Sequence, residues 1–202
     1  MREWLDGARG YRAFGRLIGA ERAYRIFSRE YVRAAPGQRV LDIGCGTAEL
    51  SDFLADADYL GLDPNESYLR AARSRHPETE LVHASFADFD AAPRSFHRVV
   101  ASGVLHHLDD DQVDALVRLA ARLLRPDGRF VTLDGARLPG QPRTVRWLLD
   151  HDRGRFVRSQ AAYAAIAERW FTRVSSITRR DLLRIPYHHV ILDCERPRVR
   201  DP

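Results

Sequence analysis

Two positions in the first half of the chain could together bind a nucleoside. Gly44 and Gly46 follow a short apolar stretch, residues 40–43, and precede a stretch with helical character. Glycines at such a turn let the backbone approach a ligand closely, and the free N–H groups of the next helix face that ligand. Asp63 ends a second apolar stretch, 17 residues after Gly46, where its carboxylate can accept hydrogen bonds from two ribose hydroxyls. A glycine turn followed by an acidic strand end is typical of nucleoside sites.

Two acids near these glycines indicate which kind of nucleoside the site would bind. A dinucleotide site needs a third glycine where this chain has Glu49, and a carboxylate beside a pyrophosphate has the wrong sign. Asp42, two residues before the first glycine, suits an orienting role toward a ligand that carries a cationic amine. The pattern therefore disfavours a nicotinamide dinucleotide.

Alternating strands and helices must position these residues. Apolar periodicity predicts helices over 1–35, 47–55, 65–75 and 109–124, and strands over 39–43, 59–62, 81–83, 96–101 and 129–134, with a turn at 126–128. This order predicts a doubly wound, mostly parallel sheet with helices on both faces. Beyond residue 135 we expect helices over 144–149 and 160–171 and two strands, 174–177 and 187–194, that pair as an antiparallel edge.

A length of 202 residues fits one domain. We expect its segments to have different roles. We expect an N-terminal helical cap (1–38), a cofactor-binding core (39–134), a helical substrate cover (135–172), C-terminal antiparallel strands (173–195) and a frayed tail (196–202).

Four stretches resemble one known family. VLDIGCGT (40–47) resembles motif I of the class I S-adenosylmethionine-dependent methyltransferases, and LGLDP (60–64) resembles their second motif. FHRVVASGVLHHL (96–108) is similar to their fourth strand and the turn after it, and LRPDGRFV (124–131) to the turn into their fifth strand. The matches keep the family's order and spacing. The resemblance implies a seven-stranded Rossmann-like α/β sheet and S-adenosylmethionine as the cofactor.

The resemblance also implies the cofactor-binding residues. It gives Asp63 the ribose hydroxyls, the two motif I glycines the methionine portion, and Ser102 a backbone contact near the amine. The expected set is Asp42, Gly44, Cys45, Gly46, Asp63, Pro64, Ser85, Phe86, Ser102, Gly103 and Val104. The chain departs from the family at Ala48, where a third glycine is common.

A second departure concerns adenine. After the third strand the family commonly has an acid that accepts from the adenine amino group, and this chain has Ser85 there. Adenine recognition then falls to the Ser85 hydroxyl and the Phe86 backbone N–H, or to Asp88 if the loop shifts.

Three residues are candidates for catalysis. His106 and His107 could act as a general base, because imidazole titrates near neutral pH. Alternatively, one of them orients the turn and the other is solvated, since methyl transfer is an in-line displacement that positioning alone can accelerate. Tyr11 could gate the pocket from the N-terminal helices, or simply pack on Phe14.

Weaker candidates lie elsewhere. Asp134 ends the fifth strand and could contact the substrate, and residues 152–155 form either a lid or a solvated connection. His188 and His189 have no clustered Cys, Asp or Glu beside them, so we expect no metal site.

Cysteine and hydropathy patterns bear on location. Cys45 and Cys194 show no disulfide or zinc spacing, and Cys45 is interpreted as a small motif residue without a nucleophilic role. No long apolar run predicts a membrane span, and the first residues do not resemble a signal peptide. We therefore expect a cytoplasmic protein.

The charge is unevenly distributed. All 32 basic residues are Arg, so no lysine can form a Schiff base. Residues 1–39 hold 9 Arg and 4 acids, residues 40–134 hold 9 Arg and 17 acids, and residues 135–202 hold 14 Arg and 7 acids. The net charge of +4 therefore comes from the two flanks that should build the substrate entrance, which favours an anionic acceptor.

The resulting hypothesis is methyl transfer from S-adenosylmethionine to an O, N or C atom of a small-molecule acceptor. Two alternatives stay open. One is a protein of the same fold that binds S-adenosylmethionine or S-adenosylhomocysteine without catalysis. The other is an RNA methyltransferase, suggested by the pI of about 9.4 but not by any clustered aromatic and basic stripe. The sequence does not indicate an oligomeric state.

Overall fold

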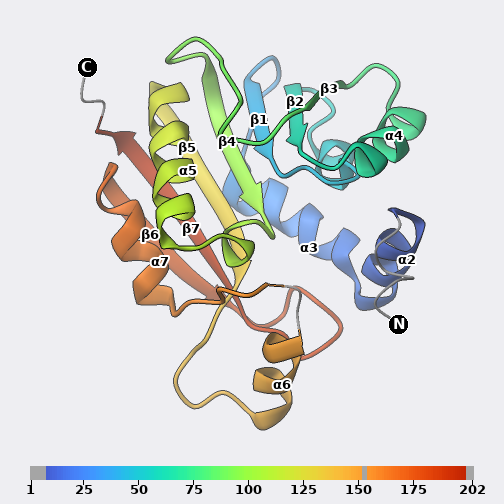
Figure 1. Ribbon diagram of the computed structural model, residues 1–202, viewed down its shortest axis with the longest axis vertical. Coiled ribbons are helices and arrows are strands. Elements are labelled where there is room, and N and C mark those ends of the chain that lie inside the picture. The colour runs from blue at the N-terminus through green and yellow to red at the C-terminus, as the bar shows by residue number, and fades with distance from the viewer. Residues whose placement is uncertain (1–7, 152–153, 199–202) are drawn as a thin grey trace.

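All strands belong to one seven-stranded sheet in the order β3-β2-β1-β4-β5-β7-β6 (Figure 1). The computed structural model describes residues 8–151 and 154–198. The strands are β1 (Arg39–Ile43), β2 (Asp58–Asp63), β3 (Glu80–His83), β4 (Phe96–Ser102), β5 (Leu124–Gly135), β6 (Phe171–Arg179) and β7 (His189–Pro197). The first five run parallel, whereas β7 is antiparallel to both β5 and β6. The predicted doubly wound, mostly parallel sheet is confirmed.

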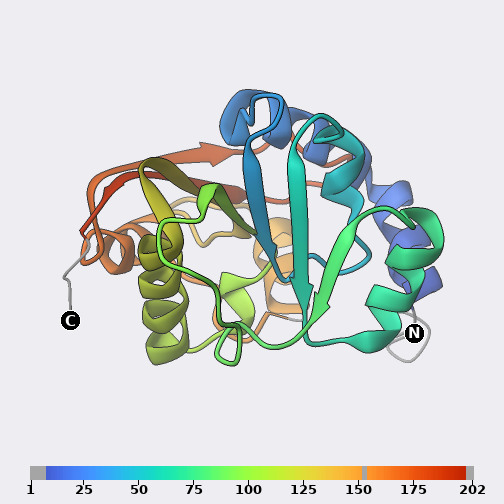
Figure 2. The same ribbon diagram turned by 90° about the horizontal axis from the view of Figure 1, so that it is seen from above.

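Helices cover both faces of the sheet (Figure 2). The helices are α2 (Ala8–Ile18), α3 (Ala20–Phe27), α4 (Glu66–Arg75), α5 (Asp110–Leu123), α6 (Arg143–His151) and α7 (Gln160–Ala167), with short helical turns η1 (Ser28–Val32), η2 (Glu49–Phe53) and η3 (Leu105–His107). On one face α3 and η1 pack Phe27 and Val32 against Val40 and Val100. On the other face α5 and α7 pack against Leu41, Val99 and Phe130, among others.

Local signals explain where the best helices begin. Asp109 and Gln112 form a capping box at α5, in which the Asp109 side chain accepts from the Gln112 N–H at 2.9 Å and the Gln112 side chain accepts in return. Asn65 caps α4 by accepting from the N–H groups of Ser67 and Tyr68. Gly19, at φ 87°, separates α2 from α3 within the predicted N-terminal helical run.

Three local predictions were wrong. The predicted helix over 47–55 is only the short turn η2, which begins after Ala48 at φ 56°. The predicted helix over 160–171 ends at Ala167, and Phe171 already starts β6. The predicted turn at 126–128 is a bulge inside a longer β5, because the register shifts between the Phe96 and Arg98 pairings.

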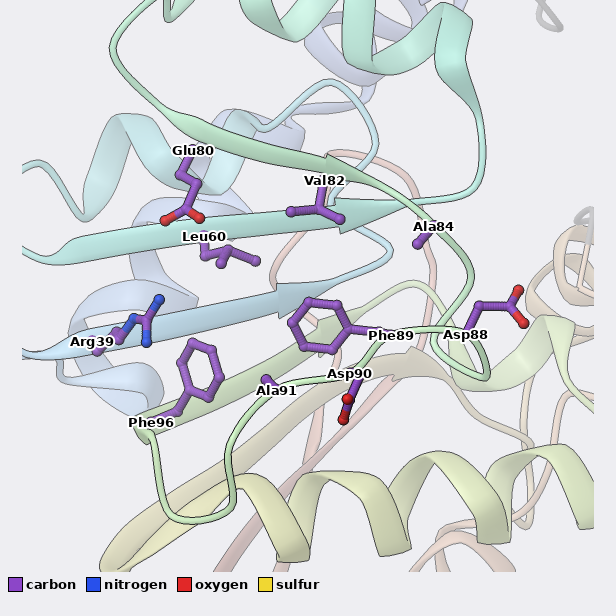
Figure 3. Close-up of a pocket in the computed structure, with 10 residues that line it drawn as sticks. All are labelled: Arg39, Leu60, Glu80, Val82, Ala84, Asp88, Phe89, Asp90, Ala91 and Phe96. Atoms are coloured by element: carbon purple, nitrogen blue, oxygen red, sulfur yellow. The ribbon is translucent and has the colours of Figure 1, made fainter.

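The crossover from β3 to β4 has no helix. Residues 84–95 form turns and irregular backbone that cross the sheet face from the end of β3 to the start of β4. A cavity of about 360 Å³ lies beneath them, into which Phe89 and Phe96 project (Figure 3). It reaches the carboxyl end of β3 only at Ala84 and Asp88, so most of it lies away from the predicted site.

The carboxyl ends of the parallel strands gather at one end of the molecule. In Figure 1 the arrowhead of β4 points toward that end, where α6 lies, and α2 lies nearby. The segment after β5 forms α6 toward that end of the molecule, whereas α7 packs in the core. That this segment covers a substrate stays a prediction. No helix in the described part of the chain is long and apolar enough to cross a membrane.

Candidate functional site

The turn after β1 brings backbone N–H groups of motif I against β2. The Gly44 and Cys45 N–H groups both donate to the Leu62 carbonyl, at 2.7 and 3.0 Å. Gly44 has φ 72°, and a Cβ there would lie 2.5 Å from a Val104 methyl. Gly46 has φ 58°, and a Cβ there would meet no atom within 4 Å. The turn therefore needs glycine at both positions, and open space lies beside Gly46.

Asp63 faces this turn from the end of β2. Its two carboxylate oxygens accept from the Gly46 and Asn65 N–H groups, at 2.8 and 2.7 Å. A carboxylate offers about four lone-pair directions, so both oxygens keep capacity for a ligand's hydroxyls. Partial burial raises the pKa of Asp63 above its usual value. The ribose contact of Asp63 stays a prediction, with which this position at the end of β2 is compatible.

Asp42 places a buried acid beneath the same turn. One oxygen accepts from the Tyr59 hydroxyl at 2.7 Å, whereas the other, Oδ1, is buried and has no hydrogen-bond partner. Burial raises the pKa of Asp42 to about 7, despite the Tyr59 hydrogen bond. A buried carboxylate oxygen without a partner is costly, and a cationic ligand group would relieve that cost.

Glu49 adds a third acid and connects the turn to the N-terminal helices. Its carboxylate pairs with Arg12 of α2 at 3.3 Å and with Arg75 of α4 at 3.7 Å, and it also accepts from the Thr47 hydroxyl. The helix α2 is thus held to the turn by an ion pair. Glu49 occupies the position where a dinucleotide site needs glycine.

The loop after β3, where the sequence predicts adenine recognition, places an acid beside Ser85. Ser85 donates its hydroxyl to Asp88 Oδ2 at 2.6 Å, and the Asp88 N–H donates back to Ser85. The sequence offered these two residues as alternatives, but the loop brings them together. His83 contacts the Pro64 carbonyl at 3.0 Å and so ties β3 to the loop after β2. The Phe86 ring packs on the core, which leaves its backbone as the group available to a ligand.

The turn after β4 lies beside the glycine turn. The Gly103 N–H donates to the Leu133 carbonyl at 2.7 Å, and Gly103 has φ 71°. Val104 packs against the Gly44 Cα, so the predicted contact residues Ser102, Gly103 and Val104 follow directly from β4 toward motif I.

His106 and Asp134 form a buried pair at the ends of β4 and β5. His106 Nδ1 lies 2.8 Å from Asp134 Oδ1, and the His106 N–H donates to the same oxygen at 3.3 Å. Asp134 Oδ2 is buried without a hydrogen-bond partner. A carboxylate on Nδ1 favours the imidazole tautomer that carries its proton on Nδ1. From the sequence alone Asp134 is only a weak candidate, because nothing local shows that the end of β5 lies beside η3.

The direction of the His106 ring follows from two glycines. Its Cε1 lies 3.8 Å from the position of a Cβ on Gly103, and its Cδ2 lies 2.0 Å from that of a Cβ on Gly154. Nε2 is bonded to both of these carbons, so it lies on the edge between the β4 turn and the segment after α6. The His107 ring stacks obliquely on His106, with 4.2 Å between centroids.

The remaining candidates have other positions. Tyr11 belongs to α2, but its side chain lies outside the described part of the structure, as do residues 152 and 153 of the predicted lid. His188 is buried, with Nδ1 3.1 Å from the Gln141 amide nitrogen. Among the described residues, no three His, Cys, Asp or Glu side chains come together as a metal ion would require. Burial raises the pKa of the Cys45 thiol, which disfavours a thiolate there.

Comparison with known proteins adds to this geometry. Residues 40–128 match a family model described as a methyltransferase domain. An uncharacterized methyltransferase of Bacillus pumilus is 30% identical over 115 residues, 56% of this chain and 54% of that protein. The chain spans about half the length of the curated relatives it matches. Within residues 40–128, the chain is therefore similar to methyltransferase domains.

Solved structures agree with the methyltransferase fold. The phosphoethanolamine N-methyltransferase 2 of Haemonchus contortus, in complex with S-adenosylmethionine, has a TM-score of 0.78 at 14% identity over 98% of this chain and 60% of that chain. The geranyl diphosphate C-methyltransferase of Streptomyces coelicolor, with S-adenosylhomocysteine, has a TM-score of 0.68 at 16% identity over 86% of this chain and 75% of that chain.

The predicted site fits S-adenosylmethionine on the features of its own residues. The ligand's ammonium matches Asp42 Oδ1, its ribose matches Asp63, and the open space beside Gly46 accommodates close approach. The carboxylates of Asp42 and Asp63 suit a ligand with a net positive charge, whereas they disfavour a pyrophosphate.

Proposed function

We propose that the chain transfers a methyl group from S-adenosylmethionine to a small-molecule acceptor, giving S-adenosylhomocysteine, with His106 taking the acceptor's proton. The His106–Asp134 pair carries this proposal, because it stands next to Gly103 at the predicted cofactor turn. His107 is not assigned this role, although its ring lies obliquely against that of His106.

The chain's residues have distinct tasks in this scheme. Asp42, Asp63 and the two motif I glycines hold the cofactor, and the Ser85–Asp88 pair accepts from the adenine amino group. When bound, the cofactor supplies an electrophilic methyl group on a sulfonium sulfur. Asp134 holds the His106 tautomer with the proton on Nδ1 and stabilises the imidazolium that forms when Nε2 takes a proton. An acceptor hydroxyl or amine would then become the attacking nucleophile.

We further propose that the acceptor carries a negative charge. Residues 1–39 and 135–202 have net charges of +5 and +7, and they contribute α2 and α6 at the site end of the molecule. The names of two fold neighbours give them phosphate-bearing substrates, phosphoethanolamine and geranyl diphosphate, which is consistent with this proposal but concerns those proteins.

Methyl labelling of a cell extract tests the function. The protein is incubated with tritium-methyl S-adenosylmethionine and extract, and the products are separated into small molecules, RNA and protein. Label in the small-molecule fraction is the expected result. Label in RNA alone would support the RNA methyltransferase alternative, and no label at all, despite cofactor binding, would support the non-catalytic one.

The role of His106 has its own test. We expect His106→Asn to lower the labelling rate by about 10²-fold or more, the usual contribution of a general base. His107→Asn is the matched control and should retain most of the rate. An equal rate in wild type and His106→Asn would contradict a base role while leaving methyl transfer intact.

A further inference from the structure

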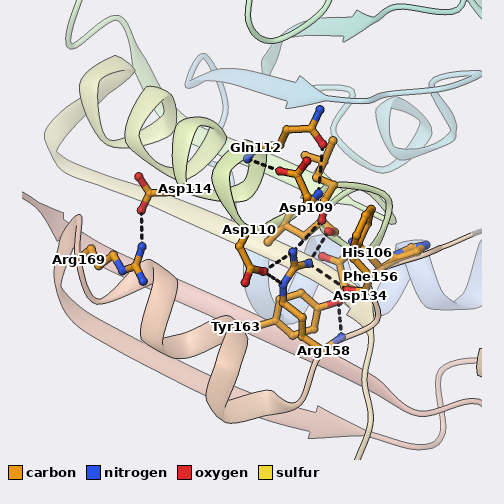
Figure 4. Close-up of polar contacts among 12 residues, drawn as sticks. His106, Asp109, Asp110, Gln112, Asp114, Asp134, Phe156, Arg158, Tyr163 and Arg169 are labelled. Atoms are coloured by element: carbon orange, nitrogen blue, oxygen red, sulfur yellow. Dashed lines mark hydrogen bonds and ion pairs between the residues drawn. The ribbon is translucent and has the colours of Figure 1, made fainter.

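Arg158, in the segment after α6, donates hydrogen bonds to the turn that carries His106. The Arg158 guanidinium donates to the Leu105 carbonyl at 3.0 Å and to the Leu108 carbonyl at 2.8 Å (Figure 4). These two carbonyls bracket His106 and His107. The same guanidinium pairs with Asp110 at the start of α5, at 2.7 Å, and its side chain is only 9% exposed. A planar fork with several donors suits simultaneous contacts of this kind.

The backbone of Arg158 reaches the strand that carries Asp134. Its carbonyl accepts from the Arg137 N–H at 2.9 Å, just beyond the end of β5. Its N–H contacts the Tyr163 hydroxyl, which in turn donates to the Gly135 carbonyl at 3.2 Å. Arg158 therefore contacts both segments that bear the His106–Asp134 pair.

The segment that contains Arg158 also abuts the imidazole itself. The Phe156 N–H donates to the His106 carbonyl at 2.9 Å. A Cβ on Gly154 would lie 2.0 Å from His106 Cδ2, 2.9 Å from Cγ and 3.0 Å from the carbonyl oxygen. The φ of Gly154 is not positive, so what excludes a side chain at this position is the close approach of His106.

We propose that Arg158 is a positioning residue for the His106–Asp134 pair, and that Gly154 is the contact against which the ring rests. Arg158 sets where η3 lies relative to the end of β5, and hence the separation of Nδ1 and the carboxylate. The role proposed for these contacts rests on the proposed function of His106.

Nuclear magnetic resonance of the histidine rings gives a readout independent of activity. Protein with ¹³C- and ¹⁵N-labelled histidine, loaded with S-adenosylhomocysteine, reports the tautomer and environment of His106, assigned with His106→Asn. We expect Arg158→Gln to shift or broaden the His106 nitrogen signals and to lower the labelling rate by about 10-fold or more. Arg158→Lys, which keeps the charge but loses the fork, should restore part of both. Cofactor affinity by calorimetry should stay within about 2-fold of wild type, because the contacts described for Arg158 are with η3, α5 and the segment after β5.

Two further variants sharpen the test. Gly154→Ala should move the His106 signals with Arg158 intact. Arg169→Gln is the matched control, since Arg169 pairs with Asp114 of the same helix α5 at 3.2 Å but is 64% exposed and away from η3 (Figure 4). It should leave the His106 signals unchanged. Unchanged His106 signals in folded Arg158→Gln, Arg158→Lys and Gly154→Ala would overturn the positioning role. The His106 signals could shift in the Arg158 and Gly154 variants while His106→Asn labels as fast as wild type. That result would support the positioning role and reject only the role of His106 as a base.

Discussion

At the residue scale, the protonation of the buried acid Asp42 should affect the stability of the protein. Burial raises the pKa of Asp42 to about 7, and its Oδ1 atom has no partner. Between about pH 4 and pH 7 the native state therefore binds a proton that the unfolded chain has lost. The free energy of unfolding falls as pH rises through that window, by an amount on the order of a few kcal/mol.

Asp42→Asn should remove this pH dependence. We expect the variant to unfold with a larger free energy than wild type at pH 8 and a similar one at pH 4, measured by urea denaturation. The same variant should bind S-adenosylmethionine more weakly, because it has lost the charge that faces the ammonium. Asp58→Asn, at the exposed start of β2, is the control. A variant that is no more stable at pH 8 would show that Asp42 is ionised at no cost.

The Ser85–Asp88 pair makes a separate prediction about adenine. If Asp88 accepts from the adenine amino group, wild-type protein should prefer S-adenosylhomocysteine over S-inosylhomocysteine, which lacks that donor. Asp88→Asn should reduce the preference by about 10-fold, the scale of one hydrogen bond to a charged group. Calorimetry with both ligands measures it. Ser85→Ala should have the smaller effect, and an unchanged preference in Asp88→Asn would assign adenine to the backbone instead.

At the element scale, α2 is joined to the cofactor turn by the Arg12–Glu49 ion pair. Both side chains are about three-quarters buried, so the pair is better shielded than most surface pairs. Arg12→Gln should loosen α2 and speed cofactor dissociation by severalfold, with little effect on overall stability. Stopped-flow release of S-adenosylhomocysteine and hydrogen exchange over residues 8–18 would measure both. Arg16→Gln on the same helix serves as control. Equal release rates in wild type, Arg12→Gln and Arg16→Gln would show that the Arg12–Glu49 ion pair does not slow cofactor release.

The elements themselves were largely predictable from local pattern. The apolar runs of β1, β2 and β4, and the capping signals of α4 and α5, correctly placed the core of the fold. The predicted β5 was too short because Pro126 and Gly128 favour a turn locally, whereas β4 pairs with β5 on both sides of them, at Leu124 and at Arg129, and leaves a bulge between. The helix expected to reach residue 171 failed because strand pairing with β7 outweighs the apolar periodicity.

The site was predictable only where it is local. Motif I and Asp63 lie on one strand-turn-strand unit, so spacing alone indicated their meeting. Other contacts join segments that are 28 to 53 residues apart in the sequence. They are the His106–Asp134 pair, the contact of Gly154 with His106 and the hydrogen bonds from Arg158 to η3. No periodicity in the sequence encodes such contacts. The Ser85–Asp88 contact depends on the path of the loop after β3. The sequence does not show that this crossover lacks a helix.

At the scale of the whole molecule, charge is separated between the cofactor core and the flanks. Residues 40–134 hold 9 Arg against 17 acids, while the flanks carry the basic excess. This arrangement should attract an anionic acceptor, and the attraction should weaken with salt. We expect KM for an anionic acceptor to rise severalfold between 50 and 500 mM NaCl while KM for a neutral analogue stays nearly constant. A neutral analogue that is methylated better than the acidic one would contradict an anionic substrate.

The residues at the ends of β1, β2 and β4 should together bind S-adenosylmethionine. Isothermal titration calorimetry of the wild-type chain and Asp63→Ala with S-adenosylmethionine and with NAD tests this binding. We expect stoichiometric binding of S-adenosylmethionine, weakened by about 10²-fold in Asp63→Ala through loss of the charged acceptor, and no binding of NAD. Binding of NAD without S-adenosylmethionine, or equal affinity in Asp63→Ala, would contradict this expectation.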